Sequence, residues 1–322
     1  MFIRAHSWLN KIKKTKMIRI ENVSKYYGAR PAVEDISFNV AKGETVGFLG
    51  PNAAGKTTTM RIITGYLMPS RGNVHIAGYN MAHNALEGRR HIGYLPESVP
   101  LYLDMTTRAY LGYAARLRGL DKAKTTSRVN AVMERCGLLE YGDVVLAKLS
   151  KGFRQRVGLA QAIIHDPDVL ILDEPTVGID PIQVAQTRRL IRELGADRTI
   201  LLSTHILPEV SMICERVVII HQGRIVAQDR IENLSAVLGG SNRIQLKIEG
   251  PAAAVSERLG RLDGIRSVTY QPPFHILEPS ADSEPRTAIM QAIFQNGWSL
   301  LSMEPVEMSL EDIFLRLTAK EG

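Results

Sequence analysis

One octapeptide, GPNAAGKT at residues 50–57, constrains the fold of this chain more than any other feature. It satisfies the pattern GxxxxGK[ST], and it lies between the strand-like run TVGFL and the helix-compatible run KTTTMRIITGYL. In this context successive backbone N–H groups and a helix N-terminus face a phosphate chain. Gly55 allows the backbone to approach closely, Lys56 neutralises the β and γ oxygens, and Thr57 can ligate Mg²⁺. The octapeptide therefore predicts a strand–loop–helix unit that binds nucleotide phosphates.

Two adjacent acids follow another apolar run. In VLILDE, residues 169–174, a buried strand delivers the carboxylates of Asp173 and Glu174 at its C-terminal end, where ligands bind in open α/β sheets. Asp173 would hold Mg²⁺, directly or through water, and Glu174 would polarise an attacking water as general base. An ordinary strand-end turn is the alternative, and the phosphate loop in the same chain weakens it.

A third motif, LSKGFRQR at residues 149–156, opens a predicted helix. Ser150 has the character of an N-cap, and Gly152 leaves the backbone exposed. A bare helix start is an anion site, whereas an ordinary capped helix is the structural alternative. The position of this motif shortly before the acidic strand favours the anion site.

The hydrophobic pattern along the chain predicts an α/β fold. The runs MIRIENVSKYY and ISFNVAKGETVGFLG alternate apolar and polar residues, which predicts strands with one solvated face. Residues 101–147 carry apolar residues at helical spacing and predict a helical insert. After residue 152 continuous apolar runs alternate with helical patterns, which predicts a parallel sheet covered on both faces.

The last third of the chain has a different pattern. LGGSN at residues 238–242 reads as a linker, and the runs after it follow the order β-α-β-β-α-β. That order predicts a small ferredoxin-like α+β domain. LEDIFLRLTA, residues 310–319, would form a closing helix.

The net charge of +7 does not support a nucleic-acid partner. Residues 1–16 contribute five of these charges through Arg4 and four lysines, so the rest of the chain is close to balance. The segment FIRAHSWLNKIKK has apolar residues at helical spacing, which suits a helix lying on a membrane surface. A disordered basic extension, or a functional start at Met17, is the favoured interpretation.

Cysteine usage and hydropathy exclude further classes. Cys136 and Cys214 form no CxxC or Cys/His pattern, which argues against a disulfide framework or a zinc site and fits a reducing cytosol. No apolar run approaches the roughly 18 residues that would span a bilayer. If the protein serves a membrane process, another chain must supply the membrane-spanning part.

In this order the motifs resemble those of the ATP-binding subunit of an ABC transporter. Residues 50–58 resemble the Walker A motif, residues 169–174 the Walker B motif with its catalytic glutamate, and LSKGFRQR the signature motif. The resemblance implies a P-loop NTPase fold of ABC type, with a parallel core sheet, an antiparallel β subdomain and a helical insert. It covers Met17 to about Asn233.

The resemblance and the C-terminal pattern together divide the chain. The expected parts are a basic N-terminal extension at 1–16, an ABC ATP-binding domain at 17–235 with a helical subdomain at about 98–165, and a C-terminal α+β accessory domain at 240–322.

The resemblance also implies roles for single residues. Glu174 would be catalytic, and His205, after TILLST, resembles the switch histidine that contacts the γ-phosphate. Tyr27 resembles the aromatic residue that stacks on adenine, and Asp180 lies in GIDP, which resembles the loop coupling the two sites of a dimer. Glu97, in IGYLPES, stands where the family usually has a glutamine that senses Mg²⁺ and the transmembrane partner. The expected ATP-binding residues are Tyr27, Gly50, Asn52, Gly55, Lys56, Thr57, Thr58, Glu97, Ser150, Gly152, Asp173 and Asp180, and the expected Mg²⁺-binding residues are Thr57, Glu97 and Asp173.

Several of these roles have structural alternatives. Tyr27 could be a half-buried strand aromatic, with Tyr26 stacking on adenine in its place. His205 could be a core histidine, and Asp180 could only cap the following helix.

Four positions depart from the family pattern. Ala53 replaces a usual glycine, at a position that the minimal motif leaves unconstrained, and Lys151 and Phe153 replace the usual Gly and Gln of the signature. Glu97 adds negative charge near ATP, which predicts an altered Mg²⁺ affinity or pH dependence. Glu97, the phrases STHILPEV and LEDIFLRLT, and the C-terminal domain resemble the exporter branch, with its gliding-motility, drug and polysaccharide export subunits.

The function that the resemblance implies is an ATPase powering an ABC exporter. ATP would join two subunits head to tail in a homodimer or pseudo-dimer, and a separate transmembrane permease would hold them at the cytoplasmic face of the membrane. The alternatives are a soluble ABC ATPase and a regulatory module without transport. One Walker A motif and no long coiled-coil insertion argue against the first, and Glu174 with His205 argues against the second. The transported substrate cannot be read, because its contacts would lie in the membrane chain.

Overall fold

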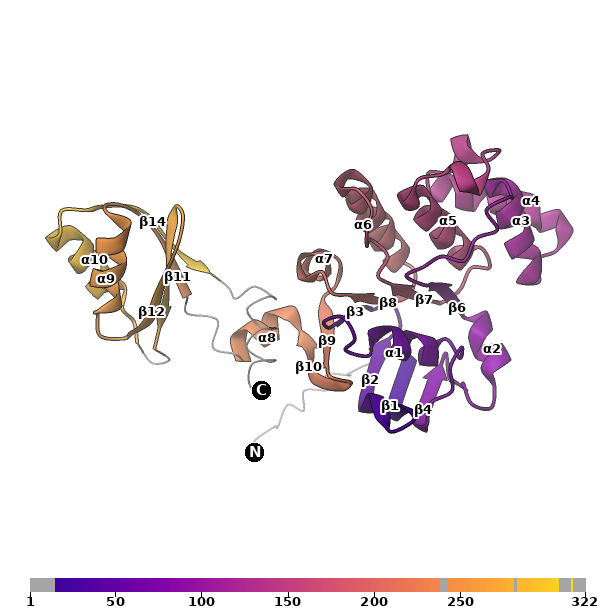
Figure 1. Cartoon of the computed structure of the whole chain (residues 1–322), viewed down its shortest axis with the longest axis horizontal. Helices are drawn as coiled ribbons and strands as arrows, with labels where there is room; N and C mark the ends of the chain where they lie inside the picture. Colours follow the sequence, from indigo (N-terminus) through magenta and orange to yellow (C-terminus); the bar gives the residue numbers. More distant parts are fainter. Residues whose placement is uncertain (1–14, 238–242, 281–282, 307–313, 315–322) are drawn as a thin grey trace, which may run out of the picture. The chain divides into compact units, whose positions relative to one another are not determined.

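The computed structural model describes residues 15–237, 243–280, 283–306 and 314 (Figure 1). The chain forms two compact units, the first ending at Gln228 and the second beginning at Asp229. Three expectations fall wholly or almost wholly outside the described residues. They are the N-terminal extension, the linker at 238–242 and the closing helix at 310–319.

A six-stranded sheet forms the centre of the first unit, in the order β10-β9-β3-β8-β7-β6. The neighbours from β9 to β6 pair in parallel, which confirms the parallel core sheet expected from the continuous apolar runs. The strands are β3 (Thr45–Leu49), β6 (Ile92–Leu95), β7 (Val169–Asp173), β8 (Thr199–Thr204), β9 (Arg216–His221) and β10 (Arg224–Arg230).

The expectation of one solvated face is wrong for β3. Residues 46–49 are all buried, because β3 lies inside the sheet between β9 and β8. The run TVGFL therefore has the two-sided burial of a central parallel strand. The longer strands β1 and β2 do keep exposed or half-buried positions among buried ones.

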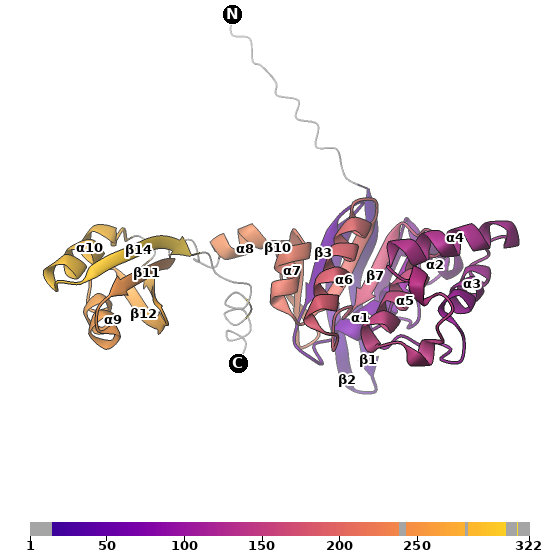
Figure 2. The same cartoon turned by 90° about the horizontal axis from the view of Figure 1, so that it is seen from above.

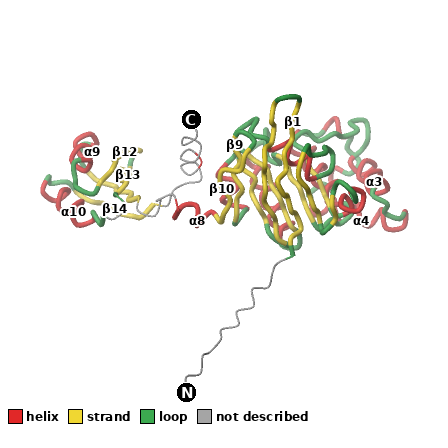
Figure 3. Tube along the Cα trace, turned by 90° about the horizontal axis from the view of Figure 1, so that it is seen from below, coloured by secondary structure: helices red, strands yellow, loops and turns green. Residues whose placement is uncertain are grey.

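A second, antiparallel sheet has the order β2-β1-β4-β5. The helix α1 (Lys56–Ile63) contributes Met60 and Ile63 to a core shared with Ile18 of this sheet and Ile171 of the parallel sheet. Figure 3 shows the strands of the first unit in yellow, running side by side with helices around them. The strands are β1 (Lys16–Tyr27), β2 (Arg30–Ala41), β4 (Arg71–Ile76) and β5 (Tyr79–Asn80).

The expected helical insert is present. Its helices α3, α4 and α5 gather in one group (Figure 2), with two short 3₁₀ turns at Leu139–Tyr141 and Leu146–Lys148 before α5. The sequence patterns did not predict the short helices α2 and α7. The helices of the unit beyond α1 are α2 (Ala85–Arg90), α3 (Thr107–Leu117), α4 (Lys122–Arg135), α5 (Lys151–Ile163), α6 (Pro181–Gly195) and α7 (Leu207–Ile213).

The second unit contains a four-stranded sheet in the order β12-β13-β11-β14, with antiparallel pairs. The helices α9 and α10 lie on one side of this sheet (Figure 1), and Leu246, Val255, Leu277 and Ile289 pack between the layers. Its elements are α8 (Ile231–Val237), β11 (Arg243–Glu249), α9 (Ala252–Gly260), β12 (Ile265–Gln271), β13 (Phe274–Pro279), α10 (Arg286–Gln295) and β14 (Ser299–Val306). In the described part of the chain, no helix has both the length and the apolar composition needed to span a bilayer.

Candidate functional site

The predicted phosphate loop connects the end of β3 to the start of α1. Gly55 precedes α1 with a φ of 107°, and a Cβ atom on it would lie 2.6 Å from the carbonyl oxygen of Ala32. A Cβ atom on Gly50 would lie 2.4 Å from the carbonyl oxygen of Ile220. Both positions therefore require glycine. Gly55 offers α1 no side-chain cap, so the first N–H groups of the helix are open to an anion.

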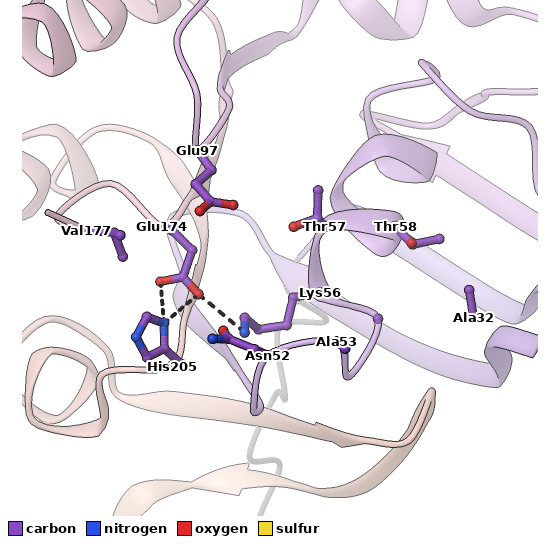
Figure 4. Close-up of a pocket in the computed structure, with 11 residues that line it drawn as sticks. Ala32, Asn52, Ala53, Lys56, Thr57, Thr58, Glu97, Glu174, Val177 and His205 are labelled. Carbon is purple, nitrogen blue, oxygen red and sulfur yellow. Dashed lines mark hydrogen bonds and ion pairs between the residues drawn. The ribbon is translucent and has the colours of Figure 1, made fainter.

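A hollow of about 570 Å³ lies against this loop (Figure 4). Loop residues form one wall, and side chains from three other segments, those of Glu97, Glu174 and His205, face them. Ala32 and Val177 also line the hollow, although no motif pointed to them. The lining residues are Ala32, Asn52, Ala53, Gly55, Lys56, Thr57, Thr58, Glu97, Glu174, Val177 and His205.

Lys56, Glu174 and His205 form a connected charged cluster in this hollow (Figure 4). The Lys56 ammonium donates to the carbonyl oxygens of Gly50 at 2.8 Å and Pro51 at 3.1 Å, and it lies 3.3 Å from Oε1 of Glu174. Nδ1 of His205 lies 3.0 Å from both carboxylate oxygens of Glu174. The His205 side chain is 40% exposed, so it is not an enclosed core histidine.

Asp173 lies at the end of β7, completely buried. Its Oδ1 accepts a hydrogen bond from the Ser203 hydroxyl, and Oδ2 has no hydrogen-bond partner among the described residues. Burial raises the pKa of the Asp173 carboxyl, the charges of Glu174 and Glu97 raise it further, and the hydroxyls of Ser203 and Thr57 oppose the rise. A divalent cation would satisfy the free oxygen, so this carboxylate fits the expected Mg²⁺ site.

The protein alone supplies few ligands for such a cation. Throughout the described ranges, no group of three or more His, Cys, Asp or Glu side chains is arranged to hold a metal ion. Mg²⁺ is usually bound by one or two protein oxygens together with substrate phosphates and water. Thr57 beside Asp173 therefore suits a cation that arrives with a nucleotide.

Two residues of the site have positive φ angles that non-glycine residues rarely adopt. Ala53 has a φ of 65° and Glu174 a φ of 49°. The glycine usual at position 53 suits this conformation, so the position is constrained even though the minimal motif leaves it open. Such conformations persist only where the surrounding structure fixes them, and they are concentrated at functional sites.

Three predicted site residues lie outside the hollow and cap or open helices. Ser150 caps α5 and accepts from the Phe153 N–H at 3.3 Å. Asp180 caps α6 and accepts from the Gln183 N–H at 3.0 Å, as the structural alternative anticipated. Gly152 is buried against the Gln183 side chain, whose Oε1 lies 1.5 Å from where a Cβ would stand. The structure therefore brings the signature and the loop of Asp180 together, apart from the phosphate loop.

Tyr27 is not among the residues that line the hollow either. It lies at the end of β1 with 52% of its surface exposed, and the Lys25 ammonium is 5.8 Å from the centre of its ring. The ring is exposed enough to stack on a ligand.

Comparison with known proteins places the chain in one family. The model of the ABC transporter family matches residues 33–177. The chain is 32% identical over 309 residues to the linearmycin resistance ATP-binding protein LnrL of Bacillus subtilis, covering 94% of this chain and 99% of that protein. It is 33% identical to the bacitracin transport ATP-binding protein BcrA of Bacillus licheniformis, covering 94% and 97%. It is 34% identical to the Nod factor export ATP-binding protein I of Paraburkholderia xenovorans, also covering 94% and 97%.

Solved structures give the same result over about two thirds of the chain. A structure described as the ATP binding subunit of an ABC transporter is 33% identical to this chain, with a TM-score of 0.64. The match covers 69% of this chain and 93% of that one. The dimeric ABC transporter cassette MJ0796 is 23% identical with a TM-score of 0.62, which supports the fold.

Proposed function

This chain belongs to the family of ABC transporter ATP-binding proteins, and on that premise we propose that it drives an exporter through an ATP site shared by two copies of the chain. It is an ATPase whose hydrolysis of ATP powers transport. Relatives named for bacitracin transport and Nod factor export match it over almost their whole length, which supports export as the direction.

The residues of the hollow take separate roles in this proposal. Lys56 neutralises the β- and γ-phosphates, Glu174 accepts the proton of the attacking water, and His205 contacts the γ-phosphate from the other side of Glu174. Thr57 and Asp173 would hold Mg²⁺, which supplies positive charge against the phosphate oxygens, with Glu97 able to accept from its water. Tyr27 would stack on adenine.

The shared site rests on one observation. The hollow holds Lys56, Glu174 and His205, whereas Ser150 and Gly152 of the signature do not line it. Lys151 at the start of α5 is exposed, which supports a helix start that faces a second copy of the chain instead of its own phosphate loop. A second copy, placed head to tail, would bring its α5 start to the γ-phosphate and complete the site.

A transmembrane permease is the second partner in the proposal. Glu97 lines the nucleotide hollow, and Asp173 belongs to the proposed cation site. Both residues also line an adjoining hollow of about 410 Å³. Residues of the helical insert, Arg118 and Gln161, form the other side of that adjoining hollow. A permease segment bound there, at the cytoplasmic face of the membrane, would sense the nucleotide through Glu97.

Glu174→Gln tests the shared site. With the general base removed, ATP and Mg²⁺ are expected to double the molecular mass measured by light scattering, because the dimer forms and cannot hydrolyse its ATP. Glu174→Gln combined with Lys56→Ala should stay monomeric, since it no longer binds the phosphates. A monomer in the presence of ATP, together with unchanged ATPase activity of Glu174→Gln, would contradict the proposal.

For the second unit we propose a ferredoxin-like fold. The support is the element order β11-α9-β12-β13-α10-β14 together with the strand order β12-β13-β11-β14 and two helices on one side.

A further inference from the structure

A buried hydrogen bond joins the two segments that carry Glu174 and His205. The hydroxyl of Thr176, two residues after Glu174, donates to Oε2 of Glu209 at 2.5 Å. Glu209 lies in α7, four residues after His205. Thr176 is 2% exposed and Glu209 is 4% exposed, and neither is among the residues lining the nucleotide hollow. The bond therefore lies outside the hollow and joins the backbone segments that carry two of its lining residues, Glu174 and His205.

This bond is one of several links between the segments. At the base, the Glu174 N–H donates to the Ser203 carbonyl at 3.0 Å. Inside the hollow, the Glu174 carboxylate contacts Nδ1 of His205 at 3.0 Å. His205 lies in the turn between β8 and α7, so β8 fixes its N-terminal side, and the Thr176–Glu209 bond fixes the helix on its C-terminal side.

The backbone around Glu174 requires such support. Glu174 has a φ of 49°, a conformation that costs about 1–2 kcal/mol for a residue with a side chain. It is kept only where the structure on both sides holds it. On the N-terminal side β7 does so, and on the C-terminal side Thr176 is anchored to α7.

Burial of the Glu209 carboxylate has an unfavourable desolvation free energy. Burial raises the pKa of its carboxyl, and the charge of Glu174 adds to the rise, while the Thr176 hydroxyl, Arg188 and His205 oppose it. A hydrophobic side chain at this place in α7 would avoid that desolvation. The acceptor that Glu209 offers to Thr176 is what a hydrophobic side chain could not provide.

We propose that Thr176 and Glu209 are positioning residues for ATP hydrolysis, whose hydrogen bond sets the place of His205 against Glu174. The inference rests on the catalytic roles proposed for Glu174 and His205. It follows that loss of the bond slows hydrolysis and leaves the binding of ATP almost unchanged, because neither residue is among those that line the nucleotide hollow. Misplacement of a catalytic group by about 1 Å can lower a rate on the order of 100-fold.

The test is a double variant, Thr176→Val with Glu209→Leu, made in the full chain. It removes donor and acceptor together, so neither polar group is left buried without a partner, and stability is expected to change little. We expect kcat for ATP hydrolysis to fall about 10- to 100-fold, with KM for ATP within about threefold of the wild type. The single variant Thr176→Ser, which keeps the hydroxyl and leaves Glu209 in place, should hydrolyse ATP at close to the wild-type rate. Thr187→Val is the matched control: Thr187 is 1% exposed, and its hydroxyl has no hydrogen-bond partner among the described residues.

A double-mutant cycle, in which the rate of ATP hydrolysis is measured with and without His205→Ala, separates positioning of His205 from general damage to the structure. If the bond acts through His205, the double variant added to His205→Ala lowers the residual rate no further, whereas independent effects multiply. A stable double variant with wild-type kcat would overturn the inference, and so would multiplying losses in the cycle.

A wrong assignment of the catalytic role of Glu174 would give a different pattern of rates. If Glu174→Gln hydrolyses ATP at the wild-type rate, the proposed role of Glu174 is wrong, whatever the double variant does. If Glu174→Gln is inactive and the double variant is fully active, only the inference about Thr176 and Glu209 fails.

Discussion

Removal of the Glu174 charge should have opposite effects on the nucleotide-free and the nucleotide-bound protein. Lys56 and Glu174 lie 3.3 Å apart, each with a side chain only 6% exposed. At an effective dielectric constant of about 20, two unit charges at this distance attract by about 5 kcal/mol before desolvation is subtracted. Removing one partner of a buried pair costs about 3–5 kcal/mol. Lys56 keeps its bonds to the carbonyls of Gly50 and Pro51, so we expect Glu174→Gln to lose about 1–3 kcal/mol of unfolding free energy without nucleotide.

ATP should more than restore this loss. In the wild type the phosphates must displace the Glu174 carboxylate from Lys56 and then lie beside its negative charge. In Glu174→Gln the ammonium has no carboxylate to give up, and the repulsion is gone. Thermal unfolding with and without MgATP measures both effects. Without nucleotide the melting temperature should fall by roughly 3–8 °C, and the rise produced by MgATP should be larger in the variant than in the wild type.

Glu97→Gln is the matched control for this experiment. It removes the same charge from the same hollow, but Glu97 is exposed and no ion pair or hydrogen bond with Lys56 is found for it in the described structure. Its nucleotide-free stability should stay within about 0.5 kcal/mol of the wild type. The reasoning is refuted if Glu174→Gln without nucleotide is as stable as the wild type, or if MgATP stabilises the two proteins equally.

Two further predictions follow from the geometry. Gly50→Ala places a methyl group 2.4 Å from the carbonyl oxygen of Ile220, so it should lower the free energy of unfolding by about 1–3 kcal/mol and abolish ATP binding, measured by denaturant titration and nucleotide fluorescence. Burial, and after it the charge of Arg118, lowers the pKa of His165 to about 4. Between pH 6.5 and about 4, the His165 imidazole therefore binds a proton more readily in the unfolded chain than in the folded protein. Stability should therefore fall as the pH falls through this window, and His165→Gln, which keeps a donor for the Ile92 carbonyl, should show a smaller fall in melting temperature from pH 7 to pH 4.5.

The parallel sheet was predictable because its strands carry a local signal. The runs that became β7 and β8 contain the continuous apolar segments VLIL and ILL, and both strands are buried along their whole length. β3 was misjudged because burial of its second face depends on pairing with β8 and β9, which begin at Thr199 and Arg216, far along the chain. The helices α2 and α7 have six and seven residues, too few to show a helical period.

Motif spacing also predicted the residues of the site, but it did not predict how they pair. Motif spacing indicated Lys56, Glu174 and His205, and the structure brings all three to one hollow. The pairing of Lys56 with Glu174, and that of Thr176 with Glu209, are tertiary contacts that spacing alone does not specify. No sequence pattern indicated Glu209, because α7 has only seven residues.

The contacts of Lys56, Glu174 and Asp173 bear on how ATP and Mg²⁺ would enter the site. Glu174, the proposed general base, lies 3.3 Å from the Lys56 ammonium and 3.0 Å from Nδ1 of His205, so both side chains engage its carboxylate. The second oxygen of Asp173 has no hydrogen-bond partner among the described residues, and burial raises the pKa of its carboxyl. Phosphates that draw Lys56 away free one side of Glu174 for a water molecule, and a cation that arrives with them satisfies Asp173. The phosphates act on the contact between Lys56 and Glu174, and the cation acts on Asp173, so we expect MgATP to bind more tightly than ATP without a divalent cation.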